Sequence, residues 1–304
     1  MSEHSHPTRP RVAFALSGGG AHGAAQVGML QALFEAGIVP DVIVGCSVGA
    51  LNGVYVAADP TPERATDLAR LWLSLQRRDV FGSRRRKTLA NALARRDHVY
   101  ENTALMRTIQ RMCPVIDLAD LKVETHVVTT DLDAARPHWW TYGPARPILQ
   151  ATTALPGVFA PVLMPGANGP SRHIDGGVAV PVPTAHAAAM EVDVVYVLDV
   201  AQGTAPAPER LNAFEVLLRS FSISRYANLP HHGSLARPGQ EIVQLPPPVT
   251  AGRDMRDFSN TAAYIEEAHA AASEFLAARA GVTTIEAQRN GWLRRTIRPG
   301  LRSA

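Results

Sequence analysis

Two short stretches near the N-terminus determine the architecture: VAFALSGGGAHG, residues 12–23, and VIVGCSVG, residues 42–49. In each, a run of β-branched and other apolar residues leads directly into glycines, and a stretch of helical character follows. We therefore expect strands over 12–16 and 42–44, with a first helix over 24–37. Further α/β alternation follows, with strands expected over 123–129 and 192–200. The sequence predicts an α/β fold with a mostly parallel sheet.

The glycines of the first stretch lie at a strand-to-helix turn, where unpaired backbone N–H groups can face an anion. They also match the G-x-G-x-x-G pattern of dinucleotide-binding folds, which is weak by itself. Such a fold needs an acidic residue at the end of the second strand, but that strand ends in Gly45-Cys46-Ser47 and Asp41 precedes it. The loop is instead interpreted as an oxyanion hole formed by Gly18, Gly19 and Gly20, supported by Gly23.

Ser47 is the centre of the second turn, in the pattern G-x-S-x-G. Gly45 and Gly49 flank it because a sharp bend between strand and helix leaves no room for side chains. The pentapeptide occurs by chance in many chains, but a preceding strand and a following Ala-rich helix are the context that supports it. The pattern predicts that Ser47 is a nucleophile.

A carboxylate followed by two glycines occurs much later, at Asp175, Gly176 and Gly177. The glycines allow the backbone to bring this carboxylate close to another group, although an isolated Asp-Gly-Gly is more often a turn. His173 is the alternative base, because side chains two apart in an extended segment point the same way and histidine is the commoner general base. We favour Asp175, since the glycine pair follows it directly.

In this order and spacing, the three motifs resemble the bacterial patatin-like phospholipases. The resemblance extends from Arg11 to Val200 and includes Ala151-Thr152-Thr153-Ala154-Leu155-Pro156, similar to the Ala-Ser-x-Ala-x-Pro block of that family. It implies a three-layer α/β/α fold and a Ser-Asp dyad, with Ser47 as nucleophile and Asp175 as base. Thr152, His22 and Val48 depart from the usual family residues, and none of them is expected to touch the dyad.

The function implied is a serine acyl-ester hydrolase of the phospholipase A or lysophospholipase type, working through an acyl-enzyme on an acyl lipid without cofactor or metal. A Ser-His-Asp triad on an α/β-hydrolase fold is the rival mechanism, but Ser47 follows only two strands, which is too early in the chain. The alternative from another class is a catalytically silent regulatory or adaptor protein on the same fold. The intact motifs argue against it.

The 304 residues, 46% of them hydrophobic, suit one large domain. We divide it into a flexible tail (1–10), the catalytic core (11–200), a C-terminal part of the same domain with a closing helix over 262–280 (201–284), and a basic tail (285–304). The first ten residues contain no apolar run, so we expect no signal peptide. Two cysteines make no disulfide framework, so Cys46 and Cys113 are expected to be packed small residues. The expected location is cytoplasmic.

Histidines and aromatic residues elsewhere are given structural roles. His186 is expected on a helix surface, and His231 and His232 have no partners at metal-ligand spacing. Trp72 and Leu75 belong to a helix capped by Thr61, where their spacing indicates core packing.

Positive charge is concentrated between Arg77 and Arg96, with eight Lys or Arg against one acid. Such runs are commonly solvated surface. The sharper hypothesis is transient, peripheral contact of Arg84-Arg85-Arg86-Lys87 with an anionic membrane surface, with Leu89 and Leu93 as an apolar stripe. Nucleic acid binding is not expected, since no motif or aromatic ladder accompanies the charge.

Overall fold

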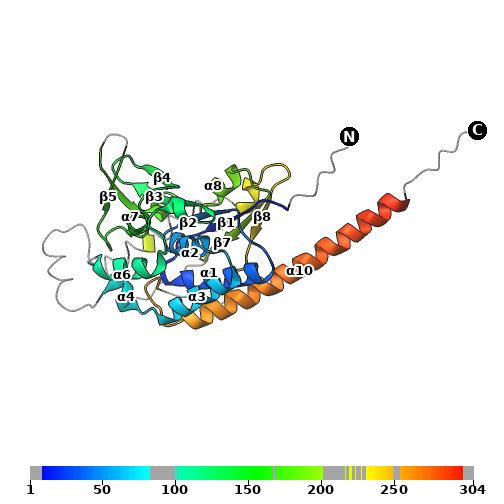
Figure 1. Ribbon diagram of the computed structural model, residues 1–304, viewed down its shortest axis with the longest axis horizontal. Coiled ribbons are helices and arrows are strands. Elements are labelled where there is room, and N and C mark those ends of the chain that lie inside the picture. Colours follow the sequence, from blue (N-terminus) through cyan, green and yellow to red (C-terminus); the bar gives the residue numbers. More distant parts are fainter. Residues whose placement is uncertain are drawn as a thin grey trace, which may run out of the picture.

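An eight-stranded mixed sheet forms the centre of the computed structural model (Figure 1), which describes residues 9–82, 100, 102–166, 169–200, 231–248 and 254–296, with isolated residues between 216 and 227. The strand order is β5-β6-β3-β2-β1-β7-β8, with β4 also paired to β3. The strands are β1 (Val12–Leu16), β2 (Val42–Cys46), β3 (Glu124–Asp131), β4 (Arg136–Trp140), β5 (Val162–Met164), β6 (Ser171–Asp175), β7 (Val194–Leu198) and β8 (Glu241–Gln244). Strands β8, β7, β1, β2 and β3 are parallel, whereas β4 and β6 run antiparallel to β3.

Helices cover both faces of this sheet (Figure 1). They are α1 (Gly23–Glu35), α2 (Val48–Ala57), α3 (Pro62–Ser74), α4 (Arg77–Phe81), α6 (Thr103–Met112), α7 (Ala145–Thr152), α8 (Thr184–Ala189) and α10 (Thr261–Thr296). Short 3-10 turns are η1 (Gly20–His22), η2 (Leu118–Asp120), η3 (Gly176–Val178) and η4 (His232–Leu235). Helices α1, α3 and α10 lie together on one face and α8 lies on the other, so the predicted three-layer α/β/α arrangement is confirmed.

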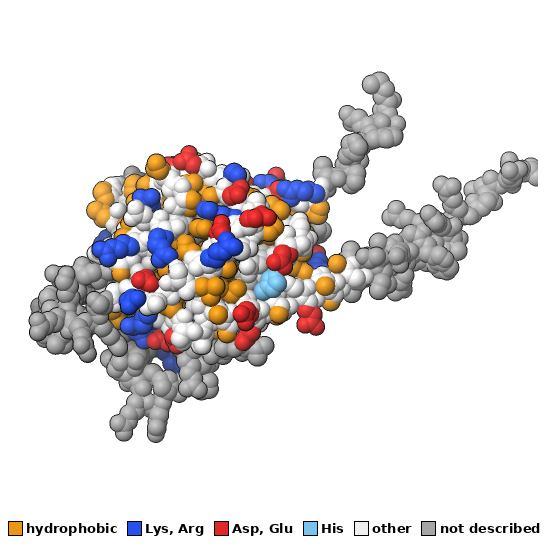
Figure 2. Space-filling view, turned by 60° about the horizontal axis from the view of Figure 1, so that its bottom comes forward, with side chains coloured by type: hydrophobic (Ala, Val, Ile, Leu, Met, Phe, Trp, Pro, Cys, Tyr) orange, Lys and Arg blue, Asp and Glu red, His pale blue; other side chains and the backbone are white. Residues whose placement is uncertain are grey.

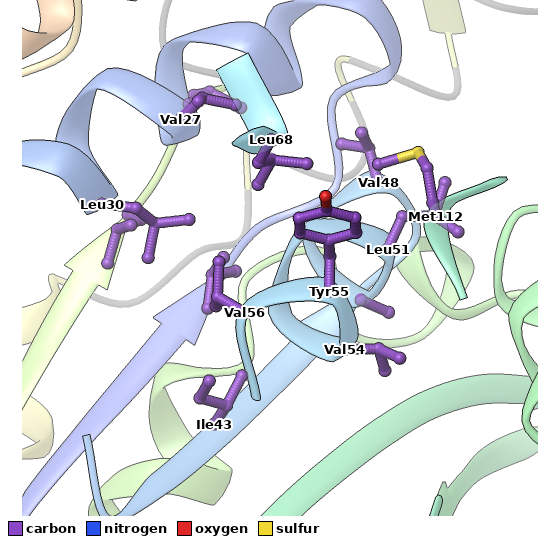
Figure 3. Close-up of a cluster of buried hydrophobic side chains, with 14 of the residues drawn as sticks. Val27, Leu30, Ile43, Val48, Leu51, Val54, Tyr55, Val56, Leu68 and Met112 are labelled. Atoms are coloured by element: carbon purple, nitrogen blue, oxygen red, sulfur yellow. The ribbon is translucent and has the colours of Figure 1, made fainter. Parts of the chain in front are cut away.

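Alternate side chains of β1 enter two different cores. Phe14 and Leu16 belong to the large core beneath α1 and α2, whereas Ala13 and Ala15 face the small core beneath α8. This division follows from the two-residue period of a strand. Figure 3 shows the large core around α2, where Ile43 is fully buried among aliphatic side chains. Burying a side chain of this size stabilises the fold by about 1.5–3 kcal/mol.

The first two strand–turn–helix units lie where the sequence predicts them, with α1 ending two residues early. The closing helix differs more, because α10 continues to Thr296 and enters the stretch expected as a basic tail. Gly281 follows the expected end and is a residue type that often terminates helices. Within a helix it costs only about 1 kcal/mol relative to alanine, which the long flanking helix tolerates. The apolar stretch 38–58 forms β2, a turn and α2, as expected.

In the described part of the chain, no helix combines the length and the apolar character needed to span a membrane. The basic segment 84–96, with Leu89 and Leu93, lies outside the described residues.

Candidate active site

Ser47 occupies the sharp turn between β2 and α2. Its backbone has φ 52° and ψ −123°, a conformation that costs a non-glycine residue about 1–3 kcal/mol. The turn is held because Gly49 packs on the end of β1, where a Cβ atom would lie 2.5 Å from the carbonyl oxygens of Leu16 and Ser17. The strained turn places the side chain in front of the first turn of α2, as a nucleophile elbow requires.

Asp175 ends β6 and lies against Ser47. The Ser47 hydroxyl donates a hydrogen bond of 2.7 Å to Oδ2 of Asp175, and the N–H of Gly177 donates one of 2.7 Å to Oδ1. Thr130 Oγ1 donates to the main-chain oxygen of Asp175 at 2.9 Å, which ties the end of β6 to β3. Asp175 is only 2% exposed and Ser47 9%. One carboxylate oxygen is therefore held by the backbone, and the other faces the hydroxyl.

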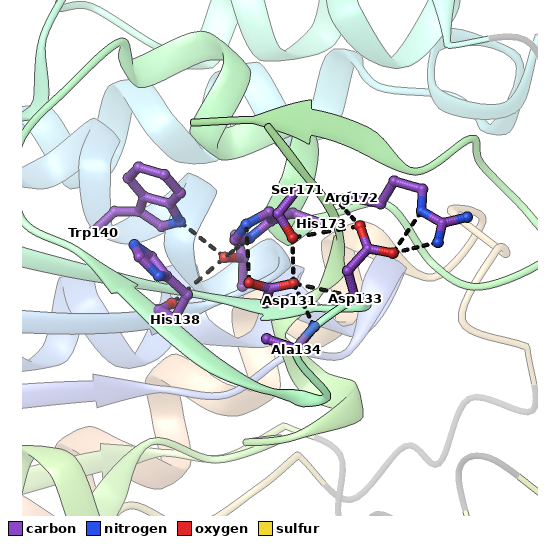
Figure 4. Close-up of polar contacts among 9 residues, drawn as sticks. Asp131, Asp133, Ala134, His138, Trp140, Ser171, Arg172 and His173 are labelled. Carbon is purple, nitrogen blue, oxygen red and sulfur yellow. Dashed lines mark hydrogen bonds and ion pairs between the residues drawn. The ribbon is translucent and has the colours of Figure 1, made fainter. Parts of the chain in front are cut away.

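His173, the alternative base, makes its contacts inside the sheet. Its Nδ1 lies 2.8 Å from Thr129 Oγ1, and its Nε2 lies 3.9 Å from Asp131 Oδ2 without a hydrogen-bond partner in the described part of the chain. Figure 4 shows the ring beside Trp140 and Asp131. Burial lowers the pKa of His173, so the ring is neutral at pH 7. Among the described residues, the hydroxyl of Ser47 is bonded to Asp175 and not to this histidine.

Polar contacts between β6 and the end of β3 hold the strand that carries Asp175 (Figure 4). Ser171 Oγ donates a hydrogen bond of 2.5 Å to Asp131, and Arg172 forms a salt bridge with Asp133. Hydrogen bonds from Arg172 lower the pKa of the Asp133 carboxyl to about 2. Asp131 also has a lowered pKa, chiefly because of the bond from Ser171. Both carboxylates are charged at neutral pH, and they fix the register of β6 next to the dyad.

The glycine loop offers two free donors where the sequence suggested three. Gly18 N–H donates to the carbonyl oxygen of Pro181 at 3.1 Å, so this group is unavailable to an oxyanion. Within the described part of the chain, the N–H groups of Gly19 and Gly20 make no hydrogen bond, and both residues line the same cavity as Ser47. Gly20 has φ +59°, and a Cβ there would lie 2.4 Å from the carbonyl oxygen of Met255. Of the three N–H groups expected to form an oxyanion hole, those of Gly19 and Gly20 are the two that carry no hydrogen bond in the described part of the chain.

Thr152 is a site residue whose contact the sequence interpretation missed. Its hydroxyl is buried, accepts a hydrogen bond of 3.0 Å from the N–H of Ser47, and donates one of 2.5 Å to the carbonyl oxygen of Val128. The expectation that no departure from the family pattern touches the dyad is therefore wrong for Thr152. The sequence did contain a signal for this contact, because Thr152 places a hydroxyl at the end of an otherwise apolar helix face. A hydroxyl buried in a core is costly unless it forms a hydrogen bond with a polar partner.

The other two departures, Val48 and His22, make packing contacts. Val48 lines the cavity next to Ser47, and its methyl groups occupy the space in front of Gly23. His22 packs edge-on against Tyr264 of α10, and burial lowers its pKa.

An apolar cavity opens beside the dyad. Its wall combines residues of α2, α3, α4 and α6 with residues that directly follow α3, follow α7 or precede α10. They are Leu51, Trp72, Leu75, Val80, Phe81, Leu105, Met112, Leu155, Phe159, Met255 and Phe258. Phe81 stacks on Phe159 at 5.6 Å, and Trp72 stacks on Phe258 at 6.0 Å between ring centroids. Trp72 and Leu75, expected as core residues alone, therefore also form the cavity wall. Such a wall suits a hydrocarbon chain.

The remaining histidines form no metal centre in the described part of the chain, where no group of three or more His, Cys, Asp or Glu converges. His186 is not a simple surface residue: it stacks on Trp139 at 3.6 Å and lies 3.0 Å from His126. Burial, and then the neighbouring His126, lower the pKa of His186 to about 4. His232 is buried in η4. Cys46 and Cys113 are both buried, as expected.

The sheet, the elbow and the buried carboxylate together define an α/β protein with a serine-hydrolase type of nucleophile turn. The sequence model of the family described as Patatin-like phospholipase matches residues 14–188, more than half of the chain. The chain belongs to this family.

Similar proteins carry related names. An uncharacterised NTE family protein of Mycobacterium bovis is 30% identical over 66% of this chain and 52% of its own length. Lysophospholipase nte1 of Aspergillus terreus is 30% identical over 62% of this chain and 12% of its own length. Patatin-like phospholipase domain-containing protein 7 of Rattus norvegicus is 29% identical over 62% and 13%. The chain thus spans about half the length of the mycobacterial relative and a smaller share of the others.

Among solved structures, VipD from Legionella pneumophila is similar with a TM-score of 0.47 and 14% sequence identity, over 89% of this chain and 67% of VipD.

Proposed function

We propose that this protein is a serine acyl-ester hydrolase acting on phospholipids or lysophospholipids, with Ser47 as nucleophile and Asp175 as general base. The observation that carries the proposal is the 2.7 Å hydrogen bond from Ser47 Oγ to Asp175 Oδ2 at the edge of an apolar cavity. The family, and relatives named lysophospholipase and patatin-like phospholipase, support a lipid ester as substrate.

Acylation begins when Ser47 Oγ attacks the ester carbonyl while Asp175 accepts its proton. The negative oxygen of the tetrahedral intermediate lies within reach of the N–H groups of Gly19 and Gly20. In comparable hydrolases, each such donor lowers the barrier by about 2.7–4 kcal/mol. Collapse of the intermediate breaks the bond to the alcohol, which leaves with the proton from Asp175. The acyl group remains on Ser47 as an ester.

Deacylation uses the same groups with water in place of the alcohol. Asp175 takes a proton from water as its oxygen attacks the acyl-enzyme, and the second tetrahedral intermediate collapses by breaking the bond to Ser47 Oγ. The proton then returns to Ser47 and the fatty acid leaves. Asp175 suits both steps because Gly177 holds its Oδ1 and leaves Oδ2 facing the reacting oxygen.

The acyl chain is assigned to the apolar cavity, and the polar headgroup to solvent. The stacked rings of Phe81 and Phe159 and the side chains of Leu105 and Met112 provide a wall without charge. Each methylene that enters contributes about 0.8 kcal/mol of transfer free energy. This favours long-chain esters over short ones.

Contact with an anionic membrane surface is part of the proposal. The four consecutive basic residues 84–87 contribute about 1 kcal/mol each near such a surface. Replacing all four by glutamine should weaken binding to vesicles that contain phosphatidylserine and slow lipid hydrolysis, while turnover of a small soluble ester stays the same. Unchanged vesicle binding at low salt would leave this stretch as ordinary solvated surface.

The test of the function is hydrolysis by the purified protein of 4-nitrophenyl butyrate, lysophosphatidylcholine and phosphatidylcholine, beside a Ser47→Ala control. We expect fatty acid release by the wild type and none by the control. If the wild type hydrolyses no member of the panel, the protein is better described as a silent adaptor on this fold.

A further inference from the structure

We infer that Gln26 and Asn52 are positioning residues for the oxyanion loop: with Trp72 they form a buried chain of amides that holds both ends of the loop over residues 18–22. The inference rests on the proposed function for its kinetic consequence, although the clamp itself is a feature of the structure. Neither amide touches Ser47 or Asp175, and both act through the backbone.

The contacts bracket the loop. Gln26 of α1 donates through Nε2 to the carbonyl oxygens of Ser17, at 2.8 Å, and Leu198, at 3.1 Å. Asn52 of α2 donates through Nδ2 to the carbonyl oxygen of Gly23, at 3.0 Å, and to Oε1 of Gln26, at 3.0 Å. Ser17 directly precedes the loop and Gly23 directly follows it. Two helices therefore hold the loop at both of its ends.

The orientation of both amides is determined by Trp72. Its indole N–H can only donate, and it donates to Oδ1 of Asn52 at 2.9 Å. The Asn52 nitrogen must then face Gly23 and Gln26, which turns the Gln26 oxygen toward Asn52 and the Gln26 nitrogen toward Ser17. Each NH₂ group uses both of its hydrogens, so the three side chains have a single consistent pattern of hydrogen bonds.

This arrangement directs the donors of the loop. Because N–H and C=O of one peptide point in opposite directions, holding the Ser17 carbonyl on Gln26 turns the Gly18 N–H away, toward Pro181. Three successive glycines follow, and glycine has the largest backbone freedom of any residue. Fixing both flanking carbonyls is what keeps Gly19 and Gly20 facing the cavity without other hydrogen bonds in the described part of the chain.

The surroundings make these amides unusual. Gln26 and Asn52 are both 0% exposed, and their neighbours on the same helices, among them Val27, Leu30 and Val54, are aliphatic (Figure 3). Burying an amide is costly unless it is hydrogen-bonded, whereas two apolar side chains of similar size would fill the same space without that requirement. Trp72 also lines the apolar cavity, so the hydrogen-bonded side chains of Trp72, Asn52 and Gln26 connect the cavity wall to the loop.

The test compares Gln26→Met, which keeps the length but removes both donors, with Leu33→Ala, a cavity-forming control in the same helix. With 4-nitrophenyl butyrate we expect Gln26→Met to lower kcat about tenfold or more with KM within about twofold, because a donor of the transition-state oxyanion is displaced. Leu33→Ala should keep kcat within about twofold. Gln26→His, whose ring N–H can replace one donor, should recover part of the loss.

Two further readouts separate positioning from stability. An alkyl trifluoromethyl ketone forms an adduct with a serine that carries an oxyanion, so its Ki should rise with the fall in kcat/KM, whereas the Ki of dodecanoate should not change. Hydrogen exchange of the peptide over 17–25 should increase in Gln26→Met and stay the same in Leu33→Ala. This second readout does not need turnover, so it decides on the clamp even if the wild type lacks esterase activity. Unchanged exchange in Gln26→Met, or equal kinetic losses in both variants, would overturn the inference.

Discussion

Replacing Asp175 by asparagine removes the proton acceptor while keeping a side chain of the same size and shape in the site. The asparagine oxygen can still accept the hydrogen bond from Gly177, which leaves the NH₂ group facing Ser47 Oγ. Such a group donates to the hydroxyl and cannot take its proton. The variant therefore retains the geometry of the dyad and loses proton transfer.

The expected loss is large because, among the described residues, the Ser47 hydroxyl is hydrogen-bonded to the Asp175 carboxylate. Positioned general bases accelerate proton transfer by about 10²–10⁴-fold. In the described part of the chain, Asp175 is the titratable group that is hydrogen-bonded to Ser47, so we expect the upper end, about 10⁴-fold in kcat/KM. At about 1.36 kcal/mol for each factor of ten, this is about 5 kcal/mol of transition-state stabilisation. Folding should not suffer, because a charge that was costly to bury has been removed.

The assay is kcat/KM for a soluble 4-nitrophenyl ester, with thermal unfolding as the check on folding. His173→Asn provides the comparison, because it removes a titratable ring from the same strand and should keep activity within about threefold. An Asp175→Asn variant that retains a tenth or more of wild-type activity would refute the reasoning. So would a loss in His173→Asn as large as that in Asp175→Asn, which would move the base to the histidine.

Three other outcomes are expected. A fluorophosphonate should add one covalent label to the wild type, measured by intact mass, and none to Ser47→Ala; a label retained in Ser47→Ala would point to another nucleophile. In a separate assay, EDTA should leave ester hydrolysis unchanged. Thr152→Val should lower the free energy of unfolding in urea by about 1–3 kcal/mol, because it leaves the N–H of Ser47 buried without a partner, whereas Thr152→Ser should change it little. His186 has a folded pKa of about 4 against 6.5 for the free side chain, so the unfolded chain binds more protons between these values and stability falls as pH drops from 6.5 to 4. His186→Phe keeps the stack on Trp139 and should flatten this slope, and parallel curves for the two proteins would contradict the assignment.

Much of the N-terminal half could be predicted because its signals are local. A run such as Val12–Leu16 followed by glycines specifies a strand and a turn through the backbone preferences of adjacent residues. The elbow at Ser47 follows from Gly45 and Gly49, which are two residues away on either side. Where local preferences and the final structure agree, neighbouring residues carry the whole of the information.

The C-terminal end shows where local signals were insufficient. A glycine at 281 is compatible both with the end of a helix and with its interior, and only the chain on either side decides between the two. His186 likewise has the spacing of a surface helix residue, but the packing of α8 over Trp139 and His126 buries much of it.

By itself, the sequence determined the α/β alternation, the turn that carries Ser47 and the two residues, Asp175 and His173, that could serve as a base for Ser47. Only the tertiary structure decided which of those residues meet. Asp175 lies 128 positions from Ser47 and reaches it because β6 pairs antiparallel with β3, which turns one end of that strand toward the elbow. The use of the Gly18 N–H by Pro181, and of the Thr152 hydroxyl by Ser47, depends on the same strand order. Backbone preferences act between neighbours, whereas such contacts depend on sheet order and register, which the whole chain sets together.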